Sequence, residues 1–243
     1  MRILGIETST RAASVAVLDD GKILAESLRE SPQSFSETLM PQVEEVIKIS
    51  GAFENLDAVA VSIGPGSFTG LRIGLATAKA LAYAWGIKII GVPTLQAMSY
   101  NFPSSKILPL IDAQKNRAYC QLFKNFSPLT ELQIKSIDEI ILEAGKLDGE
   151  IFLCGDVLHK IKIPLPTNVK LAPPNLKMPR ASSVALCAAD LKKFDNVMNL
   201  EPLYIRRAEA EELWEKRHGA AVPSLSRVDT QNPSSISSAH SFD

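Results

Sequence analysis

Short runs of alternating apolar and small residues open the chain, a pattern typical of β-strands. Three strands are predicted, with the hairpin turn Asp19-Asp20-Gly21 before the last, at residues 2–7, 13–18 and 22–28. The first turn of this meander holds one carboxylate and three hydroxyls, at Glu7, Thr8, Ser9 and Thr10. It is either an ordinary polar turn or one that wraps a phosphate through its N–H and O–H groups.

The apolar pattern then changes to a period near four, which indicates helices. A helix at 34–49 has an apolar stripe that includes Leu39, Val43 and Val46. A β-branched strand at 56–63 follows, and a glycine-rich turn leads into a long helix at 68–86. With a strand at 88–92 and a short helix at 95–100, the order becomes βββαβαβα. This order predicts an α/β domain.

The long helix at 68–86 consists largely of small side chains. Gly70 and Gly74 lie one turn apart on one face, which Ala78 and Leu81 roughly continue. This face packs on the helix's own sheet or receives a helix from a second copy or another protein. The helix has two sides, so both interpretations can hold. If a partner docks here, we expect a bulky residue at Gly74 to block pairing and leave the fold intact.

The turn before this helix is only a weak sign of phosphate binding. A Walker A loop needs Lys-Ser/Thr after its last glycine, whereas Leu71-Arg72 follow Gly70 here. The spacing of Gly64, Gly66 and Gly70 also misses the Gly-x-Gly-x-x-Gly fingerprint by one position.

The opening pattern returns after a turn-rich break at 101–105. An apolar run at 107–112 again ends in an acid, and a polar turn and a return strand at 118–123 follow. Laid over the start of the chain, Asp112 falls on Glu7. The repeat predicts two homologous α/β domains, at residues 1–102 and 103–205. The second turn lacks the small hydroxyls of the first, so the second domain is predicted to be the degenerate copy.

The rest of the second half is predicted as strands at 130–134, 151–154 and 202–205, helices at 136–144 and 182–193, and a proline-rich loop at 161–175. A charged helix at 206–218 can pack back on the first domain. Residues 219–243 are rich in serine, have no helical period and are predicted to be a disordered tail.

Composition narrows the classes of function. The chain has 243 residues, 46% of them hydrophobic, and a net charge of −1, which argues against a protein that grips nucleic acid by itself. Three widely spaced cysteines are expected to be reduced thiols of a cytoplasmic protein, and no apolar run reaches the ~18 residues that span a membrane. Three scattered histidines provide neither a metal pair nor an obvious general base, so we expect no independent catalysis.

Three motifs together resemble the TsaB family, also called YeaZ. They are Ile-Leu-Gly-Ile-Glu-Thr-Ser at 3–9, Gly-Pro-Gly-Ser-Phe-Thr-Gly-Leu-Arg-Ile-Gly at 64–74 and Pro-Leu-Tyr-Ile-Arg-Arg at 202–207. The resemblance implies two duplicated domains of the actin, Hsp70 and sugar-kinase (ASKHA, RNase H-like) superfamily. The related TsaD protein carries a His-x-x-x-His metal pair where this chain has Thr94 and Met98, so the resemblance implies no metal here.

The resemblance also implies a function. TsaB-like proteins are non-catalytic scaffolds of the bacterial machinery for threonylcarbamoyladenosine (t6A). They pair with the catalytic subunit TsaD, and the ATP-hydrolysing TsaE is expected to dock on the pair. The complex transfers a threonylcarbamoyl group to N6 of adenosine 37 in tRNAs that read codons starting with A. ATP and metal then belong to the partner subunits, the chain needs no cofactor of its own, and it meets tRNA only through the complex.

In TsaB-like proteins the first two helices form the interface, in a homodimer or with TsaD. The resemblance therefore gives an expected interface at Leu39, Val43, Val46, Phe68, Gly70, Leu71, Arg72, Gly74, Thr77, Ala78 and Leu81. The turn Glu7–Thr10 is then a vestigial nucleotide turn.

Three alternatives stay open. The first is an autonomous ATP-dependent small-molecule kinase of the same superfamily, which would use the turn at residues 7–10 together with a second phosphate loop. The second is a metalloprotease, which the absence of a histidine pair disfavours. The third is a homodimeric scaffold for another process.

Overall fold

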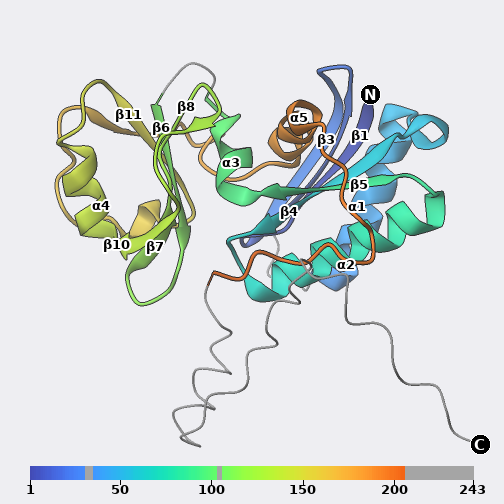
Figure 1. The fold of residues 1–243 in the computed structure, drawn as a ribbon, viewed down its shortest axis with the longest axis horizontal. Helices are drawn as coiled ribbons and strands as arrows, with labels where there is room; N and C mark the ends of the chain where they lie inside the picture. The colour runs from blue at the N-terminus through green and yellow to red at the C-terminus, as the bar shows by residue number, and fades with distance from the viewer. Residues whose placement is uncertain (31–34, 103–105, 206–243) are drawn as a thin grey trace, which may run out of the picture. The chain divides into compact units, whose positions relative to one another are not determined.

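The computed structural model describes residues 1–30, 35–102 and 106–205 (Figure 1). Residues 1–205 form one compact unit. The predicted helix at 206–218 and the predicted tail at 219–243 lie outside the described residues. Among the described residues, no helix is long and apolar enough to cross a membrane.

The first sheet has the strand order β3-β2-β1-β4-β5. Its strands are β1 (Arg2–Glu7), β2 (Ala12–Asp19), β3 (Lys22–Glu30), β4 (Ala58–Gly64) and β5 (Lys88–Pro93). The first three form the predicted antiparallel meander, while β1, β4 and β5 run parallel. The carboxyl ends of the parallel strands therefore meet at one edge of the sheet, where the turn after β1 lies.

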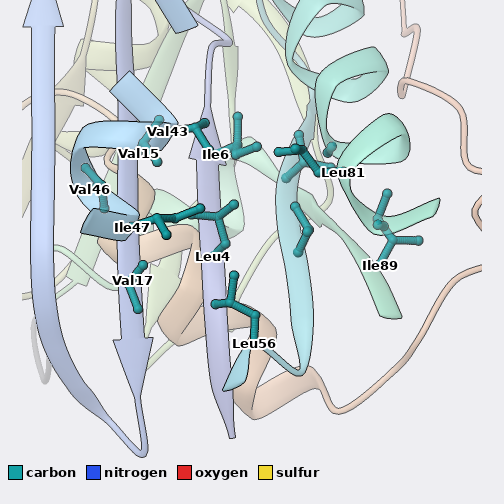
Figure 2. Close-up of a cluster of buried hydrophobic side chains, with 14 of the residues drawn as sticks. Leu4, Ile6, Val15, Val17, Val43, Val46, Ile47, Leu56, Leu81 and Ile89 are labelled. Carbon is teal, nitrogen blue, oxygen red and sulfur yellow. The ribbon is translucent and has the colours of Figure 1, made fainter. Parts of the chain in front are cut away.

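Helices cover both faces of this sheet. Alternate residues of β1 point to opposite faces, so Leu4 and Ile6 pack toward α1 (Phe35–Ser50) and α2 (Phe68–Trp85). Figure 2 shows this cluster, with Val43 and Val46 of α1 against the strands. Ile3 packs in a second cluster with residues of α5 (Ala181–Leu191). The helix α5 comes from the part of the chain that the sequence assigns to the second domain, yet it contacts the first sheet.

The second sheet repeats the strand order of the first, as β10-β7-β6-β11-β12. Its strands are β6 (Lys106–Asp112), β7 (Arg117–Cys120), β10 (Gln133–Ser136), β11 (Ile151–Gly155) and β12 (Val169–Leu171), with the short pair β8 (Phe123–Lys124) and β9 (Ser127–Pro128) beside β6. Helix α4 (Ile137–Ala144) packs on one face, and Leu95 and Met98 of α3 (Thr94–Ser99) pack in the cluster of the other.

The matching topology confirms the predicted α/β fold with an internal duplication. The second copy is reduced. A long helix, α2, connects β4 to β5, whereas the corresponding connection from β11 to β12 holds only the 3-10 turn Leu158–Lys160. The domain boundary predicted at residue 102 stays a prediction.

Some predicted elements differ from the structure. The return strand at 118–123 breaks after Cys120 because Thr130 bonds to both intervening residues: its hydroxyl accepts from Leu122 N at 3.0 Å and its carbonyl from Gln121 Nε2 at 2.8 Å. The strand predicted at 130–134 therefore begins only at Gln133. The loop at 161–175 contains the strand β12. The strand predicted at 202–205 is wrong, because that segment makes no ladder and is extended chain beside the first sheet.

The duplication also needs a small correction in register. Glu7 pairs with Ser14 across the first turn, whereas Asp112 pairs with Ala118 across the second. The second turn is one residue shorter, so the return strand of the repeat lies one position earlier than the sequence overlay predicts.

Candidate partner-binding site

The polar turn after β1 lies inside the fold. Glu7, Thr8, Ser9 and Thr10 are all buried, with at most 4% of any of them exposed. The Glu7 carboxylate accepts a hydrogen bond from Ser9 N at 2.5 Å. Burial raises the pKa of Glu7 above its ordinary value, and the hydroxyls of Ser9 and Ser62 act in the opposite direction. The turn therefore presents its hydroxyls to the chain's own interior.

The N-terminal half of α2 closes over this turn. The Thr8 hydroxyl donates to Gly70 O at 2.8 Å, and Ser67 N donates to Ser9 O at 2.6 Å. A Cβ at Gly70 would lie 2.0 Å from Thr8 O, and one at Gly74 would lie 2.1 Å from Thr8 Oγ1. The two glycines thus permit close packing of α2 on the chain's own turn. The expectation that a bulky residue at Gly74 would leave the fold intact is wrong.

The ends of α2 follow the sequence closely. Ser67 caps the helix by accepting from Gly70 N at 3.2 Å. Gly86 ends it in the left-handed region, with φ of 65°. These two residues fix where α2 begins and ends.

Most residues of the expected interface are buried in the chain's own core. Eight of the eleven are: Leu39, Val43, Val46, Gly70, Leu71, Gly74, Ala78 and Leu81. Phe68 and Thr77 are partly buried, and Arg72 is exposed. The residues that the resemblance gave as an interface are thus mostly those that face the chain's own sheet, the first of the two interpretations of this face. The apolar period of a helix marks its inner face, so it cannot by itself indicate a second contact.

A different stripe of α2 faces outward. Ala76, Ala80 and Ala84 follow one another at four-residue spacing, and all three are exposed. Tyr83 beside them is 76% exposed, and Met40 on the neighbouring helix α1 is 40% exposed. The outer surface of α2 is therefore also made largely of small side chains, with the large side chain of Tyr83 beside them, and the neighbouring helix α1 exposes Met40. Sequence reasoning recognised that this helix consists largely of small side chains, but it placed none of these three alanines in the interface.

A segment from the far end of the chain lies along one side of α2. This C-terminal segment, residues 194–205, is drawn in orange beside α2 in Figure 1. Lys79 Nζ donates to the carbonyls of Met198 and Leu200 at 2.9 and 3.1 Å. Leu203 N donates to Ile63 O at 2.7 Å, at the end of β4. The Pro-Leu-Tyr-Ile motif thus belongs to the same surface as the glycine-rich motif, although about 130 residues separate them.

Comparison with known proteins identifies the family. The family model described as TsaD, tRNA N6-adenosine threonylcarbamoyltransferase, matches residues 29–214. The tRNA threonylcarbamoyladenosine biosynthesis protein TsaB of Bacillus subtilis is 30% identical over 225 residues, which cover 88% of this chain and 98% of that protein. The chain belongs to the TsaB group of the TsaD family.

Two further relatives agree with this assignment. TsaB of Escherichia coli is 36% identical over 124 residues, which are 49% of this chain and 53% of that protein. The solved structure of YeaZ from Pseudomonas aeruginosa has a TM-score of 0.69 at 20% identity and covers 84% of this chain and 99% of its own. The chain therefore has the YeaZ fold.

The resemblance places Thr94 and Met98 where TsaD-like proteins are expected to hold a metal. Both residues are buried in α3. The Met98 side chain packs in an apolar cluster that includes Leu95 and Ile107, and a thioether is a poor ligand for a hard cation. Among the described residues, no three His, Cys, Asp or Glu side chains gather as a metal site.

The second copy of the turn is also occupied by the chain itself. Asp112 at the end of β6 accepts from Lys160 Nζ at 2.6 Å, and Asp112 N donates to Asp156 Oδ1 at 2.9 Å. Burial raises the pKa of Asp156, and the nearby Asp112 charge adds to that effect. These acids form an internal network with Lys160, which disfavours a second phosphate loop here.

Proposed function

We propose that this chain is the non-catalytic subunit of a t6A machinery and pairs with the catalytic subunit TsaD through the outer faces of α1 and α2. The observation that carries the proposal is the exposed alanine stripe of α2, Ala76, Ala80 and Ala84, on a helix whose opposite face is already used by the chain's own fold. Membership in the TsaB group supports a role in t6A formation, and the exposed surface of α2 supports pairing through this helix.

The outer face has the physical properties of a helix-docking surface. Side chains of one carbon let a second helix approach within about 8–10 Å of the α2 axis. Tyr83 and Met40 provide large apolar contacts at the edges, and partly buried Thr77 lies at the margin of the same face. Exposed Tyr and Met side chains around a flat small-residue centre are features of protein interfaces rather than of solvated helices.

The same face would join two copies of this chain when TsaD is absent. We propose that ATP and metal are used by the partner subunits, including TsaE, and that tRNA is reached only through the complex in the cytoplasm. What supports this division is the packing of the turn at Glu7–Thr10 beneath α2 and the loss of metal ligands at Thr94 and Met98. The chain then acts by holding TsaD in a productive arrangement.

Ala80→Arg tests the surface. A long charged side chain at the centre of the stripe should abolish the mixed complex with TsaD in size-exclusion chromatography with light scattering. It should also stop t6A formation in a reconstituted reaction. Leu142→Arg is the matched control, because Leu142 is 58% exposed on α4 of the second sheet.

The outcomes separate the candidate functions. A mixed complex that survives Ala80→Arg would show that the outer face of α2 is not the interface. A wild-type chain that ignores TsaD yet hydrolyses ATP with a small-molecule substrate would overturn the proposal and favour the kinase alternative.

A further inference from the structure

The guanidinium of Arg72 is held in a fixed orientation at the edge of the outer face of α2. It lies 3.8 Å from the centre of the Phe68 ring and 5.8 Å from that of Tyr204. Its Nε donates to the Tyr204 hydroxyl at 2.9 Å. The two rings contact each other, with centroids 5.0 Å apart. Stacking on aromatic faces and one hydrogen bond remove much of the freedom that an exposed arginine otherwise has.

This arginine differs from the other well-anchored arginines of the chain. Arg2, Arg29 and Arg180 each pair with a carboxylate, of Asp19, Glu45 and Glu26. Among the described residues, Arg72 has no carboxylate partner and uses one of its five N–H donors. Its four remaining donors are those of the two terminal nitrogens, which form the fork that recognises planar anions.

The segment that holds this arginine exposes large apolar side chains. Tyr204, which contacts Arg72, is 44% exposed, and its chain neighbours Leu203 and Ile205 are 41% and 37% exposed. An interface that covers them would remove water from the guanidinium and leave its donors unpaired unless the partner supplied an anion. Arg72 also lies one helical turn before Ala76, so it borders the proposed docking face.

We propose that Arg72 is the receptor for a carboxylate side chain of the protein partner, bound by a bidentate pair on a platform of Phe68 and Tyr204. The inference rests on the proposed function, since it names the polar contact of that docking surface. Phosphate of an RNA is the less favoured ligand. The neighbouring cation Lys79 is engaged by Met198 and Leu200, the flanks are apolar, and the net charge of the chain is −1.

The test measures affinity for TsaD by calorimetry with four forms of the full chain. Arg72→Gln should weaken binding by at least about 30-fold, the lower end of the range expected when one partner of a desolvated, hydrogen-bonded charge pair is removed. Arg72→Lys keeps the charge but loses the fork, so it should also weaken binding measurably. Tyr204→Phe keeps the ring platform and should change affinity less than threefold. Arg117→Gln, on the second sheet, is the matched arginine control.

These measurements distinguish two roles of Arg72: binding a carboxylate of the partner, or only holding the C-terminal segment in place. If Arg72 served only to hold the C-terminal segment, Tyr204→Phe would weaken TsaD binding as much as Arg72→Gln, and that result would overturn the inference. Thermal melting of each variant checks folding, and Arg72→Lys keeps the test valid if Arg72→Gln melts early. Charge reversal at Arg72, rescued by reversal of one Asp or Glu of TsaD, would identify the partner carboxylate.

Three other outcomes have separate meanings. If the wild-type chain does not bind TsaD, the proposed function itself fails. If wild type binds and Arg72→Gln binds equally well, only the receptor inference fails. If Arg72→Gln leaves TsaD binding unchanged but weakens capture of tRNA by the assembled complex, the ligand is phosphate and the carboxylate assignment is wrong.

Discussion

Gly74→Ala tests whether the close packing of α2 on the turn at residues 7–10 stabilises the fold. The added Cβ would lie 2.1 Å from Thr8 Oγ1, a distance that forces the buried Thr8 side chain to move. Such a movement breaks the 2.8 Å bond from the Thr8 hydroxyl to Gly70 O. The added methyl group would thus both break a hydrogen bond and overpack the contact between α2 and the turn.

The size of the effect follows from three contributions. A buried polar group left unpaired costs about 1–3 kcal/mol, and overpacking costs about 1–3 kcal/mol. Replacing glycine by alanine inside a helix stabilises by about 1 kcal/mol. We therefore expect Gly74→Ala to lower the free energy of unfolding by about 1–5 kcal/mol.

Urea unfolding followed by circular dichroism measures this change. Ala76→Gly, on the exposed face of the same helix, calibrates helix propensity without touching the turn. Thr8→Ala removes the atom that the new methyl meets, so the double variant should recover about 1–3 kcal/mol relative to the sum of the single changes. A Gly74→Ala protein more stable than wild type by the propensity gain alone would refute the reasoning.

Two further predictions concern two acidic residues of the first sheet, Glu7 in β1 and Glu26 in β3. Glu7 has a raised pKa in the folded state, so wild type should lose stability as pH rises above the ordinary value of 4.5. Glu7→Gln should match wild type in urea unfolding below pH 4.5 and exceed it at pH 7; equal stability at both would contradict this. Although burial acts to raise it, the bonds from Arg180 and Ser182 lower the pKa of Glu26 overall. The contribution of Glu26 to stability is thus present above pH 4.5 and lost in acid. Glu26→Ala should therefore destabilise the protein by about 2–4 kcal/mol at pH 7 and by less at pH 3. The control Glu30→Ala, at an exposed position, should change stability little.

Local signals in the sequence predicted local structure well. The helices predicted at 68–86 and 136–144 agree with α2 and α4 because their ends are decided by nearby residues, such as the caps at Ser67 and Ser136. The duplication was also visible, because an apolar run ending in an acid requires no knowledge of distant contacts.

The assignment of surfaces could not be made in the same way. Whether Gly74 faces a partner or Thr8 depends on a contact across 66 positions, which helix periodicity does not contain. The contact of Arg72 with Tyr204 likewise joins residues that lie 132 positions apart, so helix periodicity does not contain it either. The motif at 202–207 indicated that these residues matter, but only the fold shows that they share a surface with α2.

The missing counterpart of α2 in the second sheet has a consequence for stoichiometry. Among the described residues, the second sheet has no counterpart of α2, since the connection from β11 to β12 holds only a 3-10 turn. If the outer face of α2 pairs both with a second copy and with TsaD, as proposed, it can be occupied only once, and the two assemblies would exclude each other. The supply of free chain would then set how much TsaD is engaged, because each homodimer withholds two chains from it. An assembly built through this one face would stop at a pair and could not grow into a chain of subunits.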